Sequence, residues 1–186
     1  MKKFELTTEF ITNMFGKKLF RIKALVEFGN VKAGELGGYV EKEENVSQDG
    51  NAWVSGNAEV SGNARVSGNA RVSGNAWVYG NAEVYGDAWV SGNAWVSGNA
   101  EVSGNARVSS DADYALVQGF GTEFRCTTFY RGKNKKIMVN CGCFHGDLEG
   151  FRKQVKETRN GKIAKEYLMI ADLMEYHFTS EDSSNE

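Results

Sequence analysis

The segment NAWVSGNAEVSGNARVSG, residues 51–68, opens a repeat that continues in the same register to Val108. Every sixth residue from Val54 to Val108 is a valine, and an alanine stands two positions before each of these valines. Gly-Asn joins successive hexads, with the single exception of Gly86-Asp87. The repeating unit is therefore Asn-Ala-x-Val-Ser-Gly, and its ten consecutive copies exclude a chance pattern.

The six-residue period favours strands over helices, because it matches neither a heptad nor the 3.6-residue turn of an α-helix. Ala-x-Val alternates as a strand does, and Gly-Asn is a turn signal. A short strand and a bend, repeated, build a parallel β-solenoid in which each strand pairs with its copy about 4.8 Å away. The chain has 22 glycines and no proline, as expected where every rung donates to a ladder. We therefore predict a mainly β protein with a parallel β-helix of either two or three hexads per coil.

The x position of each hexad indicates what the outer surface carries. With three hexads per coil, the x residues form one column of Trp53, Arg71, Trp89 and Arg107, a second of Glu59, Trp77 and Trp95, and a third of Arg65, Glu83 and Glu101. Tyr79 and Tyr85 replace the usual serine. A soluble monomer rarely exposes so much aromatic surface. We expect the four tryptophans, the two tyrosines, Arg71 and Arg107 to bind a protein or a second copy, as a dimer or trimer; the alternative is that Trp and Tyr simply suit strands.

The repeat is flanked by segments of different composition. Residues 1–50 are predicted to form an N-terminal cap and degenerate first coils, with one or two strands in 19–28, and residues 51–113 form the β-helix proper. Residues 114–179 are predicted to form a small α+β module with a β-hairpin (123–130 and 136–144) and two helices, the first capped by Asp147. The acidic tail, 180–186, is predicted to be disordered.

Several segments resemble known proteins. Written as Val-Ser-Gly-Asn-Ala-x, the hexad resembles the hexapeptide repeat of left-handed parallel β-helices. The stretches GELGGYVEKEENVSQDGNAWVSG, CGCFHGDLEGFRKQVKET and EYLMIADLMEYHF are similar to bacterial and prophage β-helix proteins, labelled polymer-forming or YdcK-like, that carry a phage-type C-terminal module. The resemblance implies a left-handed helix and a non-enzymatic phage protein that binds a host protein, such as an anti-CRISPR inhibitor of bacterial immunity. Hexapeptide acyltransferases use a histidine base, but His145 and His177 both lie outside the repeat, so this activity is the alternative.

The composition limits the kinds of binding partner and the cellular compartment that we expect for this protein. The 22 Lys+Arg nearly balance the 24 Asp+Glu, which excludes a polycation built for nucleic acid. No apolar run approaches the roughly 20 residues of a membrane span, and the N-terminus lacks a signal-peptide core. Three cysteines are an odd number, which argues against a disulfide framework. We therefore expect the protein to reside in the cytoplasm of the bacterial host and to have no membrane partner.

The C-terminal module holds the remaining candidate sites. Cys141, Cys143 and His145 alternate along one predicted strand, and Cys126 lies on the neighbouring strand. Together these four residues are a weak candidate for a zinc site, because their spacing is not a common zinc-binding pattern. We therefore predict no metal, cofactor or catalytic residue. Residues 131–165 carry ten Lys+Arg and three acids, a local charge of +7. The basic turn with Lys133, Lys135 and Lys136 is a candidate contact for nucleic acid, a nucleotide or an acidic protein. The third functional hypothesis is an oligomer that sequesters a nucleotide with these basic residues. The alternative is that the basic residues form only a solvated helix face and no binding site.

Overall fold

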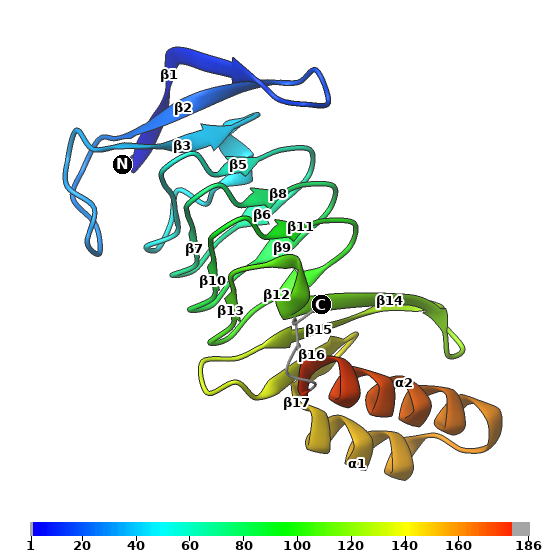
Figure 1. Ribbon diagram of the computed structural model, residues 1–186. Helices are drawn as coiled ribbons and strands as arrows, with labels where there is room; N and C mark the ends of the chain where they lie inside the picture. Colours follow the sequence, from blue (N-terminus) through cyan, green and yellow to red (C-terminus); the bar gives the residue numbers. More distant parts are fainter. Residues whose placement is uncertain (1, 180–186) are drawn as a thin grey trace, which may run out of the picture. The chain divides into compact units, whose positions relative to one another are not determined.

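The computed structural model describes residues 2–179 and divides after Asp111 into two compact units (Figure 1). The first unit is a parallel β-solenoid, and the second combines an antiparallel sheet with two helices. The predicted mainly β fold class is therefore confirmed. The expectation of a disordered tail at 180–186 falls outside the described residues.

The hexads form the rungs of the solenoid (Figure 1). Each strand pairs in parallel with the strand three hexads later, so Val54, Val72, Val90 and Val108 lie in one row. This pairing resolves the alternative left open by the sequence, because it requires three hexads per coil; the handedness stays a prediction. The rungs are β4 (Trp53–Val54), β5 (Glu59–Val60), β6 (Arg65–Val66), β7 (Arg71–Val72), β8 (Trp77–Val78), β9 (Glu83–Val84), β10 (Trp89–Val90), β11 (Trp95–Val96), β12 (Glu101–Val102) and β13 (Arg107–Val108).

Alanine and valine fill the interior of the solenoid, where every copy from Ala52 to Val108 is fully buried. At the corners the repeat glycines have positive φ, such as +67° at Gly56, where a Cβ would lie 3.2 Å from the Gly74 carbonyl oxygen. The asparagines form ladders along these corners: Asn63 donates to Asn81 at 3.1 Å, and Asn81 donates to Asn99 at 3.0 Å. The Gly-Asn pair thus provides both the turn and a side-chain link between coils.

The N-terminal segment extends one sheet of the solenoid. Strands β1 (Phe4–Thr12), β2 (Lys18–Ala24) and β3 (Leu36–Val40) pair antiparallel in this order, and β3 then runs parallel to β5. Strands were expected within 19–28, whereas β1 was not predicted. The 3₁₀ helix η1 (Glu43–Asn45) follows β3 and leads into the first coil.

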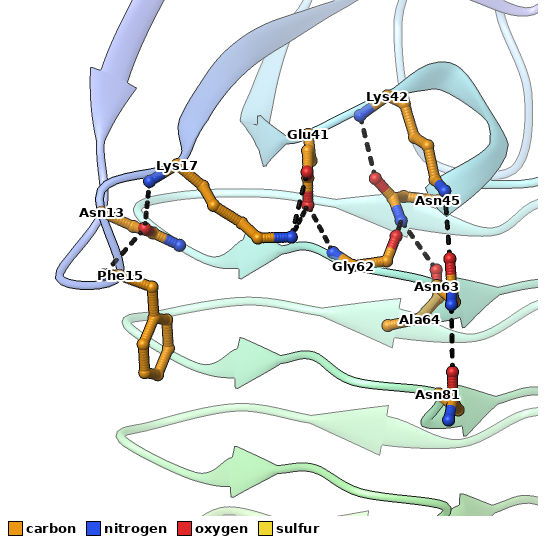
Figure 2. Close-up of polar contacts among 10 residues, drawn as sticks. All are labelled: Asn13, Phe15, Lys17, Glu41, Lys42, Asn45, Gly62, Asn63, Ala64 and Asn81. Atoms are coloured by element: carbon orange, nitrogen blue, oxygen red, sulfur yellow. Dashed lines mark hydrogen bonds and ion pairs between the residues drawn. The ribbon is translucent and has the colours of Figure 1, made fainter.

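Polar side chains satisfy the free backbone edge of the first coil (Figure 2). The buried Asn45 amide donates to the carbonyl oxygens of Gly62, at 3.2 Å, and Ala64, at 2.8 Å, as a further strand would. The Glu41 carboxylate accepts from the Gly62 amide and pairs with Lys17 at 2.9 Å. Although burial opposes it, the Gly62 hydrogen bond and the Lys17 ammonium hold the pKa of Glu41 below its ordinary value. These contacts replace the backbone hydrogen bonds that a preceding coil of the solenoid would make.

The second unit packs two helices on a four-stranded antiparallel sheet. After the 3₁₀ helix η2 (Asp111–Asp113), strands β14 (Tyr114–Phe120), β15 (Arg125–Arg131), β16 (Ile137–Cys141) and β17 (Phe144–Asp147) pair in chain order, followed by α1 (Leu148–Thr158) and α2 (Gly161–Thr179). The sequence predicted only a two-strand hairpin here, whereas the sheet has four strands. The Asp147 cap is confirmed, because its Oδ1 accepts from the Gly150 amide at 2.9 Å. Phe129, Val139, Phe151 and Ala171 belong to the shared core.

Candidate functional site

The second column of the solenoid carries a partly exposed aromatic surface. Trp77 and Trp95 stack with their rings parallel, 1° apart in plane, and their centroids 4.9 Å apart. Phe15, from the turn between β1 and β2, contacts the rings of Trp77 and Tyr79 at centroid distances of 6.2 and 5.4 Å. Trp95 is 38% exposed and Phe15 is 52% exposed. We call these four residues, Phe15, Trp77, Tyr79 and Trp95, the aromatic patch.

The turn that carries Phe15 is held in place by hydrogen bonds (Figure 2). The Asn13 side-chain oxygen accepts from the backbone amides of Phe15, at 3.0 Å, and Lys17, at 2.9 Å. The ion pair between Lys17 and Glu41 ties the same turn to the first coil. These contacts hold the backbone of the turn and so reduce the conformational entropy that this segment would lose when a partner binds. Phe15 was not predicted as a binding residue, although Met14 and Phe15 are unusual apolar residues for a turn.

The first column contains the predicted tryptophan–arginine alternation, but only part of it is exposed. The Arg107 guanidinium lies 4.6 Å from the centre of the Trp89 ring, and Trp89 is 49% exposed. Trp53, in contrast, is only 2% exposed, because Phe4 and Phe28 pack edge-on against its ring. Trp53 therefore cannot serve as the exposed binding residue that the repeat position suggested. Arg71, beside it in the column, is partly exposed.

The third column is acidic and borders a groove. Arg65, Glu83 and Glu101 follow one another from β6 to β12. Burial and the neighbouring Glu83 charge raise the pKa of Glu101, while a hydrogen bond with Tyr85 opposes this shift. A groove of about 530 Å³ lies against Arg65 and Glu83, with η1 on its other side. Tyr85 is thus engaged with Glu101 and lies outside the aromatic patch.

Glu59 lies next to Trp77 of the aromatic patch in the second column, and it leads to a prediction about how stability depends on pH. It stands between Tyr39 and Trp77 in the second column, and its buried Oε2 atom has no hydrogen-bond partner among residues 2–179. Burial raises the pKa of Glu59. A raised carboxyl pKa in the folded state means that stability is greatest when Glu59 is protonated and falls as pH rises through that pKa.

We therefore expect Glu59→Gln to increase the free energy of unfolding at pH 7 and to have little effect near pH 4, where the wild-type carboxyl group is mostly protonated. Urea unfolding at the two pH values measures the difference. Glu44→Gln, which removes an exposed carboxylate, is the matched control and should give no comparable gain. A Glu59→Gln variant that is less stable at pH 7 would contradict this expectation.

The basic turn of the second unit is only partly free to bind. Lys133 and Lys135 are exposed, whereas the Lys136 ammonium pairs with the Asp147 carboxylate at 3.3 Å. The Gly150 hydrogen bond and Lys136 lower the pKa of Asp147 despite some burial. Arg152 pairs with Asp172 and Glu175 of α2, at 2.7 and 2.8 Å. These acids lie beyond 131–165 in the sequence, so the local charge of +7 is partly neutralised in the fold.

The cysteines and His145 do not form the row that the sequence suggested. The chain reverses at Gly142, with φ of +59°, so β16 ends at Cys141 and β17 begins at Phe144. Cys143 is exposed in the intervening turn, and Cys141 accepts a hydrogen bond from Thr127 at 3.1 Å. Among the described residues, no group of three or more His, Cys, Asp or Glu side chains is placed to hold a metal ion. The predicted alternation of Cys141, Cys143 and His145 along one strand is therefore wrong.

Comparison with known proteins supports the solenoid alone. Within residues 2–179 no helix is long and apolar enough to cross a membrane. No curated protein gives a significant match to the chain. A family model described as the YdcK beta solenoid repeat matches residues 64–80, nearly one coil of three hexads. In this repeat, the chain is similar to YdcK-type β-solenoid proteins.

Proposed function

We propose that this chain is a non-enzymatic binding protein whose aromatic patch contacts another protein. The observation that carries the proposal is the patch itself: two stacked tryptophans extended by Tyr79 and Phe15, partly exposed on a rigid solenoid. Tryptophan and tyrosine are enriched among the residues that dominate binding energy at protein interfaces. Stacking and the hydrogen-bonded turn fix these side chains before binding, which lowers the entropy lost on association.

The partner that we propose is a host protein of a bacterial defence system, which this chain would inhibit by binding. The support for this finer proposal is the similarity of residues 34–56, 141–158 and 166–178 to phage-type β-helix proteins. Small phage proteins that act without catalysis commonly block a host protein by covering its surface. An anti-CRISPR or another anti-defence activity is the corresponding biological role.

The experiment compares the capture of partners from host lysate by the wild type and by two variants in which exposed aromatic residues are replaced by serine. Phe15→Ser combined with Trp95→Ser removes the exposed part of the patch and leaves the buried Ala and Val rows intact. Loss of an aromatic anchor commonly costs 2 kcal/mol or more, so we expect binding to weaken about thirtyfold or more. Trp89→Ser, at the same repeat position in another column, is the control and should retain the partner.

Two outcomes would assign the binding surface elsewhere. If the patch variant binds normally while Lys133→Gln with Lys135→Gln does not, the basic turn is the working surface. If instead the patch joins copies of this chain, light scattering should give a dimer or trimer for the wild type and a monomer for the patch variant. The first outcome overturns the proposal, and the second replaces the host protein by a second copy.

A further inference from the structure

The second unit contains a cavity of about 250 Å³. Its walls come from the loop before β15, the end of β16, the residue that follows α1 and the first turns of α2. The lining residues are Thr122, Glu123, Arg125, Cys141, Arg159 and Tyr167. This set is almost entirely polar, and it brings together segments that are distant in sequence.

The two arginines of the cavity differ from the other two in this unit. Arg131 pairs with Asp113 at 3.0 Å, and Arg152 pairs with Asp172 and Glu175. Within residues 112–179, neither Arg125 nor Arg159 forms an ion pair with a carboxylate. The two arginines without an ion pair thus line the same cavity, and Glu123 is its single acidic lining residue.

Glycines make room for the polar groups that form the cavity. A Cβ at Gly121 would lie 2.3 Å from the Tyr167 hydroxyl oxygen, and one at Gly142 would lie 2.6 Å from Arg125 Nη1. Both glycines have positive φ, +75° and +59°, so a side chain there would also strain the backbone. Tyr167 donates to the Phe120 carbonyl oxygen at 3.3 Å, which aims the phenol at this loop.

Electrostatics agree with this geometry. Burial, together with Cys141, raises the pKa of Tyr167, and the charges of Arg159 and Arg125 act in the opposite direction. Both guanidinium groups are thus close enough to the phenol to influence its ionisation. Tyr167 remains a neutral hydroxyl at physiological pH, and its single proton is donated to the Phe120 carbonyl oxygen.

A smaller hollow of about 60 Å³ adjoins the cavity through the shared residues Cys141, Arg159 and Tyr167. Its remaining wall consists of the apolar residues Phe144, Phe151 and Val155 together with Gln154 and Thr158. The combined site therefore offers two cationic forks beside room for a small apolar group. This pairing is typical of sites that bind an organic anion.

We propose that the cavity binds a small organic anion whose phosphate or carboxylate group lies between Arg125 and Arg159. The planar guanidinium groups match either oxyanion with paired N–H donors, and the Thr122 hydroxyl supplies a further donor. The apolar part of the ligand extends toward Phe144 and Val155. Because Glu123 offsets one of the two positive charges, the site retains a net charge of +1, which favours an anion over a neutral ligand.

The test is isothermal titration calorimetry of the full chain with three probes: inorganic phosphate, isopropyl phosphate and isobutyrate. We expect saturable binding, with one of the isopropyl-bearing anions tighter than inorganic phosphate, and the better of the two identifies the oxyanion. Arg125→Gln or Arg159→Gln should weaken this binding about tenfold or more, as expected for a lost charge-assisted hydrogen bond. Lys133→Gln removes the same charge outside the cavity and should change the affinity less than twofold.

Absence of binding of all three probes to the wild type would overturn the proposal, and so would an equal loss in the Lys133→Gln control. Amide chemical-shift changes in the unmodified chain provide a second measurement that does not depend on folding of the variants. Shifts at Thr122, Gly142 and Tyr167 on addition of the tightest probe support the site. Shifts confined to residues 132–136 would contradict it.

Discussion

Val78→Asp is expected to unfold the solenoid. Val78 is fully buried, and its neighbours in the row are Val60 and Val96. The narrow interior is lined by alanine and valine, so an aspartate there would have no polar partner. Burial of an unpaired carboxyl group costs several kcal/mol, a large share of the stability of a small domain. Circular dichroism at increasing temperature should show loss of the cooperative transition of the first unit.

Asn99→Asp is the matched control for this substitution. It introduces the same carboxyl group into the repeat, but at an exposed corner where the hexad at Asp87 already carries aspartate. Asn99 accepts a hydrogen bond from Asn81, and an aspartate can accept the same bond. We expect this variant to melt close to the wild type. A Val78→Asp protein that melts like the control would mean that the valine row does not face the interior.

Trp53→Ala should destabilise the first unit by about 3–5 kcal/mol, the usual range for removal of a buried large aromatic side chain. The Trp53 ring is enclosed by Phe4 and Phe28, and it covers Gly37 so closely that a Cβ there would lie 2.8 Å from the ring. Loss of the ring would leave a cavity between the N-terminal strands and the first coil. Urea unfolding of the full chain measures the change in the free energy of unfolding.

Trp95→Ala tests whether this large effect comes from burial or from the repeat position. Both tryptophans occupy the x position of a hexad, but Trp95 is partly exposed and loses mainly its stack with Trp77. We expect a cost of about 1 kcal/mol, the typical contribution of an aromatic pair. Equal losses of stability in the two variants would show that the N-terminal strands do not cover Trp53.

Within the solenoid, the local pattern was sufficient to predict the strands and the interior. A valine and an alanine in every hexad, separated by one residue, require alternation in a strand, and Gly-Asn requires a turn. Each of these properties depends on residues that are neighbours in the sequence, so the repeat alone determined them. The Asp147 cap of α1 was predictable for the same reason, because it lies three residues from the amide that it accepts from.

The number of hexads per coil could not be obtained in this way. Either two or three hexads give plausible columns of charged and aromatic side chains, so the surface chemistry does not discriminate between them. The pairing of Val54 with Val72 selects three hexads. That choice depends on how the corners close each coil, which is a property of the assembled solenoid.

The candidate binding surface was only partly predictable, since exposure depends on segments far away in the sequence. Trp53 and Trp95 are equivalent in the repeat, yet the N-terminal strands bury one and leave the other exposed. Phe15 joins the aromatic patch from a turn that lies about sixty residues before Trp77. The repeat therefore predicted which side chains point out of the coil, and the tertiary packing decided which of them reach the surface.

In the second unit, the tertiary structure reduces the expected excess of positive charge and interrupts the expected row of cysteines for a similar physical reason. The excess of Lys and Arg in residues 131–165 is partly neutralised by Asp172 and Glu175, which helix packing brings beside Arg152. The expected row of cysteines ends where the backbone reverses at Gly142. The sequence by itself determined the solenoid, its interior and the helix cap, because these follow from local periodicity. Only the tertiary structure decided the coil size, the exposed aromatic patch and the cavity between Arg125 and Arg159, because these depend on contacts between distant residues.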